Sequence, residues 1–146
     1  MVATADTVVV DASVAVKWHL RDEDYVPEAE RLLTRFSQGA VNLVAPDHIR
    51  YEVPAAITVA TIGSQPRLTQ QQGQSAIEDF LALGLTTVGT DRLILAAYPL
   101  VHQYAIALYD ALYLALARQL GCSLVTADRK LYQRIGRLPE VHWIGR

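Results

Sequence analysis

The stretch from Tyr109 to Arg129 constrains the fold of this chain more than any other part of the sequence. Residues 110–119 are strong helix formers that begin with an acid, and the helix-ending residue Gly121 follows them. Residues 123–126 are a short apolar run of strand length, and Asp128 comes just after them, before a second helical segment. A helix, a strand, an acid and a helix in this order are typical of an open sheet of parallel strands.

Asp110 and Asp128 are predicted to be neighbours in space although they are distant in sequence. In an open α/β sheet, a helix that feeds a parallel strand descends from the edge where the strands have their carboxyl ends. The first residue of the helix and the residue after the strand therefore share that edge. Ligands of such sheets bind outside the same edge, so both acids are candidates for a functional site.

The rest of the chain predicts the same alternation of elements. Strands are predicted at residues 7–10, 43–45, 86–88, 123–126 and 141–144. The other helices are predicted at residues 12–20, at 27–37, after the Pro46-Asp47 turn toward Gly63, after a capping box formed by Thr69 and Gln72, from Asp91 with a break near Pro99, and at 129–135. Strands that alternate with helices imply a parallel sheet covered on both faces.

Length and composition limit the class of protein. A chain of 146 residues fits one domain, residues 1–146, with a sizeable core. Its hydrophobic content of 51% and charged content of 19% exclude a disordered protein. The lone Cys122 excludes an internal disulfide framework and a multi-cysteine zinc site, and a reducing, cytoplasmic setting is expected. Residues 1–10 lack the features of a signal peptide, and residues 93–109 are too short and too polar to span a bilayer.

Charge is unevenly spread along the sequence. The whole chain carries −2, whereas residues 118–146 hold six basic residues against two acids and so carry +4. Arg129, Lys130 and Arg134 in this segment could contact a phosphate backbone or simply keep the last helix soluble. From charge alone, an ordinary solvated face is the simpler interpretation.

Four acids map to the carboxyl edge of the predicted sheet. Asp11 directly follows the first strand, and Glu52 is expected about two turns into the helix after the second strand, beside Asp110 and Asp128. Carboxylates only a few ångströms apart repel one another, so such a cluster requires protonation or a bound cation. Carboxylates without a His or Cys partner suit Mg²⁺ or Mn²⁺ better than zinc. Ions of this kind activate water and neutralise charge on a phosphodiester, which predicts metal-assisted phosphoester hydrolysis.

The residues around these acids resemble the PIN-domain ribonucleases, and among them the VapC-type toxins of bacterial toxin-antitoxin pairs. Four motifs in the family's order and spacing span nearly the whole chain. They are Val10-Asp11-Ala12-Ser13 with Lys17-Trp18, Tyr51-Glu52-Val53, the run from Tyr109 to Ala117, and Leu124-Val125-Thr126-Ala127-Asp128. Each motif alone is weak, but together they are specific.

The resemblance implies a three-layer α/β/α fold with a central, mostly parallel sheet of four to five strands. It also implies endonucleolytic cleavage of single-stranded or looped RNA that depends on Mg²⁺ or Mn²⁺. The catalytic and metal-binding acids that it implies are Asp11, Glu52, Asp110 and Asp128, and the polar supports are Ser13 and Thr126. The resemblance further implies a homodimer and a small cognate antitoxin whose tail occludes the site.

Two positions depart from the family pattern. Many relatives carry a further acid two residues after the last aspartate, where this chain has Lys130, and this puts a complete second metal site in doubt. Pro54 lies two residues after Glu52 and requires either a late start or a kink in its helix.

Ordinary structural roles are the alternative for each of these residues. Asp11 and Asp128 could merely end strands or cap helices, and Asp110 could be only an acid in a first helical turn. His48 lies four residues before Glu52 and could face the same way, but a surface histidine is the simpler expectation.

Two other classes of function are open at this point. An aspartate-based phosphoryl-transfer protein of the dehalogenase or response-regulator type would use one aspartate as the phosphate acceptor. The dehalogenase pattern, however, needs a second Asp where Ser13 stands, and a response regulator needs an acid pair at the end of the first strand. A non-catalytic interaction module would keep the fold and use the acids to dock a protein.

Overall fold

One sheet of five parallel strands organises the structure, a computed structural model that describes residues 5–146. The first four residues of the stretch tested for a signal peptide lie outside this range. The strand order is β3-β2-β1-β4-β5. The strands are β1 (Asp6–Val10), β2 (Val41–Pro46), β3 (Thr86–Val88), β4 (Ser123–Thr126) and β5 (Val141–Trp143). All neighbouring strands are parallel, which confirms the predicted sheet.

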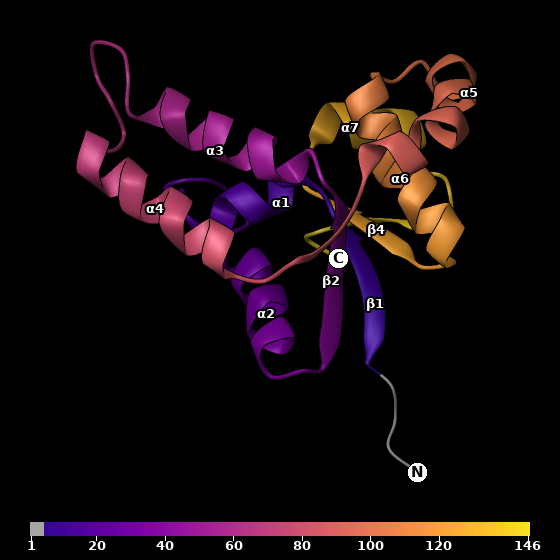
Figure 1. Cartoon of the computed structure of the whole chain (residues 1–146), viewed down its shortest axis with the longest axis horizontal. Helices are drawn as coiled ribbons and strands as arrows, with labels where there is room; N and C mark the ends of the chain where they lie inside the picture. The colour runs from indigo at the N-terminus through magenta and orange to yellow at the C-terminus, as the bar shows by residue number, and fades with distance from the viewer. Residues whose placement is uncertain (1–4) are drawn as a thin grey trace.

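Helices cover both faces of this sheet. Those that lead from β1 to β3 lie on one side and those that lead from β3 to β5 lie on the other (Figure 1). The first group comprises α1 (Ala12–Ala15), the 3₁₀ helix η1 (Val16–Trp18), α2 (Val26–Ser37), α3 (Ile49–Ala60) and α4 (Gln70–Ala82). The second comprises the 3₁₀ helix η2 (Thr90–Arg92), α5 (Ile94–Tyr104), α6 (Leu108–Leu120) and α7 (Arg129–Ile135). The three-layer α/β/α prediction is therefore confirmed.

Helix α6 is the central helix of the second face. Every residue from Ala111 to Ala117 is buried, and the helix packs on β1, β2 and β4. Strand residues Val9, Val10 and Leu124 are fully buried in the same core. Gly121 ends α6 in the left-handed conformation at φ 63°, as the sequence predicts. This packing fixes the first turn of α6, with Asp110 in it, at the carboxyl edge of the sheet.

Two prolines lie inside helices, and neither interrupts its helix. Helix α3 begins at Ile49 and continues through Pro54, so Glu52 lies in its first turn and not two turns in. Helix α5 is likewise continuous through Pro99, and the predicted break is wrong. The residues four positions earlier, Arg50 and Leu95, are exposed, so the carbonyl groups that lose a donor lie on the solvent side of each helix.

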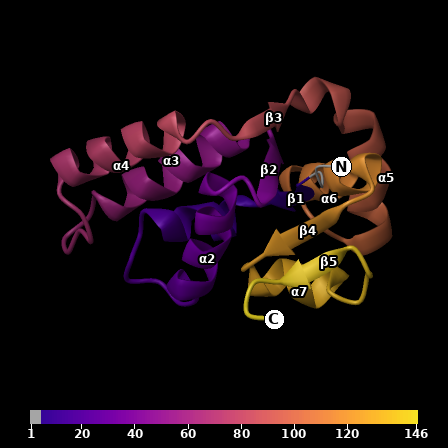
Figure 2. The ribbon, with the colours of Figure 1, turned by 90° about the horizontal axis from the view of Figure 1, so that it is seen from below.

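The α3 and α4 helices form an antiparallel hairpin that extends away from the sheet (Figures 1 and 2). The predicted capping box starts α4, because the Thr69 side chain accepts from the Gln72 amide at 3.1 Å and the Gln72 side chain accepts from the Thr69 amide at 2.9 Å.

No single helix within residues 5–146 is long and apolar enough to cross a membrane. In that part of the chain, α5 and α6 are long and apolar enough only when taken together, and they are bent by 113° relative to each other.

Candidate active site

Asp11 is the most buried acid at the carboxyl edge of the sheet. It follows β1 directly and begins α1 by accepting a hydrogen bond from the Val14 amide at 3.3 Å. Its Oδ1 accepts from the Ser13 hydroxyl at 2.5 Å and its Oδ2 from the Thr126 hydroxyl at 2.5 Å. The residue is only 3% exposed, and burial raises its pKa to about 6, although all three hydrogen bonds act in the opposite direction.

Two hydroxyl groups join the end of β1 to the end of β4. The Ser13 oxygen accepts from the amide of Ala127 at 2.8 Å, and the Thr126 oxygen accepts from the amide of Asp128 at 3.0 Å. Because both hydroxyls also donate to Asp11, they connect its carboxylate to the peptides that lead into Asp128. Asp11, and not Ser13, caps the helix that follows β1.

Asp110 faces the other three acids from the first turn of α6. Burial, followed by the charges of Asp128, Asp11 and Glu52, raises the pKa of the Asp110 carboxyl to about 7. No hydrogen bond to this carboxylate contributes to the shift within the described part of the chain. Asp128, by contrast, caps α7 by accepting from the Leu131 amide at 3.1 Å. The structure thus brings the four acids to one edge. Of the two acids with raised pKa values, Asp110 is the one whose charge no hydrogen bond stabilises within the described residues.

Glu52 reaches the same edge from the first turn of α3. Its Oε1 accepts from the Tyr113 hydroxyl at 2.8 Å and lies 3.0 Å from Nε2 of His48. Burial and the Glu52 charge raise the pKa of Tyr113 well above its ordinary range, so this hydroxyl stays protonated and donates.

The donor set suits a hard divalent cation. Within residues 5–146, no three acid, His or Cys side chains already converge as closely as a metal site requires. The available ligand atoms are nevertheless carboxylate oxygens, which Mg²⁺ and Mn²⁺ prefer. Burial is the largest cause of the raised pKa values of Asp11 and Asp110, and the charges of neighbouring acids add to it, so ionised carboxylates are costly at this edge. A cation would offset that cost.

The sequence pattern of the PIN domain family matches residues 8–138, a span that includes all four acids. The chain belongs to the PIN domain family. Ribonuclease VapC12 of Mycobacterium tuberculosis (strain CDC 1551 / Oshkosh) is 29% identical to it over 137 residues, which are 94% of this chain and 98% of that protein.

Solved structures share the fold of this PIN domain. The crystal structure of Mycobacterium tuberculosis VapC20, a Sarcin-Ricin loop cleaving toxin, matches with a TM-score of 0.63 and 14% identity over 86% of this chain and 93% of that one. VapBC2 from Rickettsia felis, bound to a promoter DNA fragment, matches with a TM-score of 0.62 and 15% identity over 94% and 96% of the two chains. The match to the PIN domain family over residues 8–138 separates the chain from the dehalogenases and response regulators considered above.

The basic residues predicted to meet phosphate lie on the exposed side of α7 of this PIN domain. Arg129, Lys130 and Arg134 are all exposed, and none of them forms a salt bridge within residues 5–146. Arg129 directly follows Asp128 and lines a polar hollow together with Lys17 and the acids Asp22, Glu23 and Asp24. In the described part of the chain these three side chains are therefore exposed to solvent without an ion-pair partner.

Sequence reasoning missed Tyr113 and assigned His48 no role at the site. Tyr113 lies in the buried middle of α6, where its place in an apolar run suggests only core packing. His48 is only 17% exposed at its side chain, so the expectation of a surface histidine is wrong. Its spacing of four residues from Glu52 was the one sequence signal for the contact between His48 and Glu52. Its contact with Tyr113 and Tyr109 depends on how α6 packs against α3, which no local pattern encodes.

Proposed function

We propose that this PIN domain is an endoribonuclease and the toxin of a VapC-type toxin-antitoxin pair, active with Mg²⁺ or Mn²⁺. The relatives support it, because VapC12 is named a ribonuclease and VapC20 a Sarcin-Ricin loop cleaving toxin. The observation that carries the proposal is the half-buried Asp110 carboxylate, which faces three other acids and has a pKa raised to about 7. Such a site is arranged to receive a cation.

Four acids, Asp11, Glu52, Asp110 and Asp128, are the proposed catalytic and metal-binding residues. A bound Mg²⁺ or Mn²⁺ would lower the pKa of a water molecule and stabilise negative charge that develops on the phosphodiester. Asp110 offers both carboxylate oxygens to such a cation, since no hydrogen bond within the described residues contributes to its pKa shift. Ser13 and Thr126 hold the Asp11 carboxylate in a fixed orientation through their hydroxyl groups. Lys130 in place of a further acid favours one well-formed metal site over two.

RNA in single-stranded or looped form is the proposed substrate. Arg129, Lys130 and Arg134 would bind the phosphates beside the scissile bond, because they are exposed on the helix that Asp128 caps and form no salt bridge within residues 5–146. The carboxyl edge would then hold the reacting phosphate, while the basic side chains of α7 compensate the flanking charges.

A second copy of the chain and a cognate antitoxin are the proposed protein partners, in a cytoplasmic setting. The solved relative from Rickettsia felis is a VapBC pair bound to promoter DNA. An antitoxin tail that covers the carboxyl edge would silence the enzyme, because the substrate phosphate and the tail would compete for the same acids and basic residues.

The direct test is cleavage of RNA by the protein freed of antitoxin. We expect internal cuts in the presence of Mn²⁺ or Mg²⁺ and none in EDTA. Since water is the proposed nucleophile, the products should carry 5′-phosphate and 3′-hydroxyl ends. Products with cyclic phosphates, or unchanged cleavage in EDTA, would contradict the proposal.

A further inference from the structure

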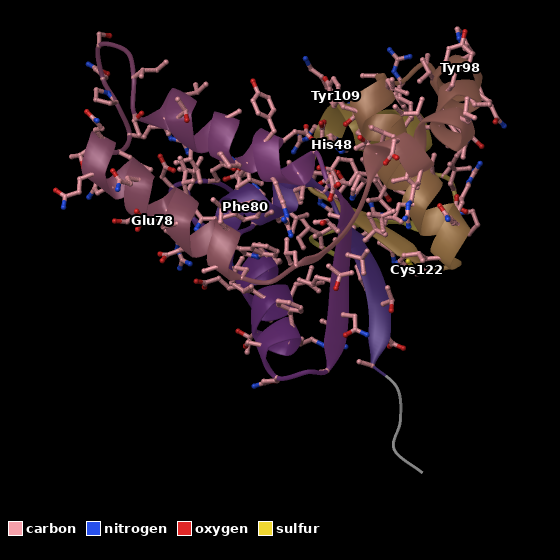
Figure 3. All side chains as sticks on the ribbon, viewed as in Figure 1. His48, Glu78, Phe80, Tyr98, Tyr109 and Cys122 are labelled. Atoms are coloured by element: carbon pink, nitrogen blue, oxygen red, sulfur yellow. The ribbon has the colours of Figure 1, made fainter. Side chains whose placement is uncertain are left out.

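His48 lies where the start of α3 meets the start of α6, next to Tyr109 (Figure 3). Its Nε2 is 2.9 Å from the backbone oxygen of Tyr109 and 3.0 Å from Oε1 of Glu52. A carbonyl oxygen can only accept, so Nε2 must carry hydrogen and donate it to Tyr109. The imidazole therefore connects the helix that carries Glu52 to the residue just before Asp110.

The surroundings hold this imidazole in one place. Its ring centroid is 4.7 Å from that of Tyr113, and the two ring planes make an angle of 50°. Nδ1 is buried and has no hydrogen-bond partner within residues 5–146. The polar contacts of the ring are consequently concentrated on Nε2, on the side of Glu52 and Tyr109.

Tyr113 and His48 both contact a single oxygen of Glu52. The Tyr113 hydroxyl donates to Oε1 at 2.8 Å, and Nε2 of His48 lies beside the same atom. These contacts come from two different helices and leave the other oxygen, Oε2, outside the pair of contacts. Contacts that hold one oxygen of a carboxylate also restrict the direction of the second, and Glu52 is close enough to Asp110 for its charge to raise the pKa of that carboxyl.

We propose that His48 is a positioning residue, which fixes the Glu52 carboxylate with Oε2 available for the cation and couples it to the start of α6. The inference rests on the proposed function, because it assigns His48 a role toward the metal that Glu52 would bind. His48 acts through Glu52 and touches neither RNA nor the cation. Outer residues of this kind typically change metal affinity or activity by about 10- to 100-fold when they are replaced.

Two replacements of similar size separate this role from simple packing. In His48→Gln the amide nitrogen takes the approximate place of Nε2, whereas in His48→Asn it takes that of Nδ1. We expect His48→Asn to weaken Mn²⁺ binding, measured by calorimetry, and to lower kcat, each by about 10- to 100-fold, with KM for RNA close to the wild-type value. His48→Gln should recover most of both losses. If His48→Asn does not fold, His48→Leu is measured in its place, because leucine keeps the bulk against Tyr113 and has no hydrogen-bond donor.

Two controls define the outcome. His102→Asn changes an exposed histidine on α5 and should leave Mn²⁺ affinity and kcat unaltered. In a Glu52→Gln background, His48→Asn should cause no further loss of Mn²⁺ affinity, because its route of action is already removed. Equal Mn²⁺ affinity in His48→Asn, His48→Gln and wild type would overturn the inference alone. So would an undiminished effect of His48→Asn in the Glu52→Gln background. A wild-type protein that neither binds Mn²⁺ nor cuts RNA would overturn the proposed function itself.

Discussion

The hydroxyl of Thr126 donates to Oδ2 of Asp11 at 2.5 Å and ties together the ends of two adjacent strands, β4 and β1. The hydrogen bond compensates only part of the cost of placing a carboxylate in the core, since the pKa of Asp11 is still raised to about 6. The carboxyl edge is thus a place where the fold keeps negative charge at a cost in stability. Most of the predictions below follow from that cost.

Stability of the metal-free protein should fall as pH rises. The pKa of Asp11 is raised from 3.8 to about 6 and that of Asp110 from 3.8 to about 7. Between pH 4 and pH 7 the folded chain therefore holds protons that the unfolded chain releases, and the free energy of unfolding decreases through this window. Melting temperatures measured in EDTA at intervals from pH 5 to pH 8 should drop by several degrees, and Asp110→Asn should flatten the curve. A wild-type melting temperature that rises over this range would contradict the account.

Divalent ions should raise the melting temperature at neutral pH, because a ligand that binds only the folded state stabilises it. Asp110→Asn should raise the metal-free value by relieving repulsion, and it should shrink the shift that Mn²⁺ produces. Asp11→Asn should act in the same direction but raise the metal-free value less, since Asp11 accepts hydrogen bonds from Ser13 and Thr126 that an amide satisfies poorly. Melting temperatures measured in Mn²⁺ and in EDTA test this prediction. A wild-type melting temperature that Mn²⁺ does not change would contradict a metal site shared by these acids.

Much of the edge could be predicted because strand ends are local features. Asp11 and Asp128 follow short apolar runs, and parallel pairing of β1 with β4 is enough to bring them together. Glu52 was placed a turn too deep because Pro54 does not reveal where α3 begins, and the start at Ile49 depends on how the chain leaves β2. The spacing of four residues allowed a contact between His48 and Glu52, whereas the contact of Tyr113 with Glu52 could not be predicted, because it requires α6 to pack beside α3 across 61 residues of sequence.

Lys130→Ala should weaken RNA binding a few-fold and in a salt-dependent way. An exposed lysine that meets one phosphate releases about one counterion, so its loss should reduce the slope of log affinity against log salt by about one. Arg35→Ala, an exposed cation on α2, is the matched control and should change neither value. Fluorescence anisotropy with a labelled single strand at several salt concentrations gives both numbers. Identical slopes for Lys130→Ala and wild type would remove Lys130 from the substrate site.

Light scattering should give a mass twice the 16.1 kDa of one chain. Helix α5 exposes large apolar side chains, with Leu95 at 88% and Tyr98 at 58%, and Figure 3 shows Tyr98 on the outer side of the molecule. Leu95→Glu should shift the protein toward monomer, whereas Leu81→Glu on α4, where Leu81 is 57% exposed, should not. A monomer at micromolar concentration in the wild type would count against the homodimer.

The most direct test of the central claim is RNA cleavage by Asp110→Asn under single-turnover conditions in Mn²⁺. The replacement keeps the shape of the side chain and removes its charge, so we predict a loss in rate on the order of 100-fold or more, with the fold retained. Asp91→Asn, an exposed acid that also follows a strand, should cut at the wild-type rate. A folded Asp110→Asn protein that cleaves RNA as fast as wild type would contradict a mechanism based on these four acids.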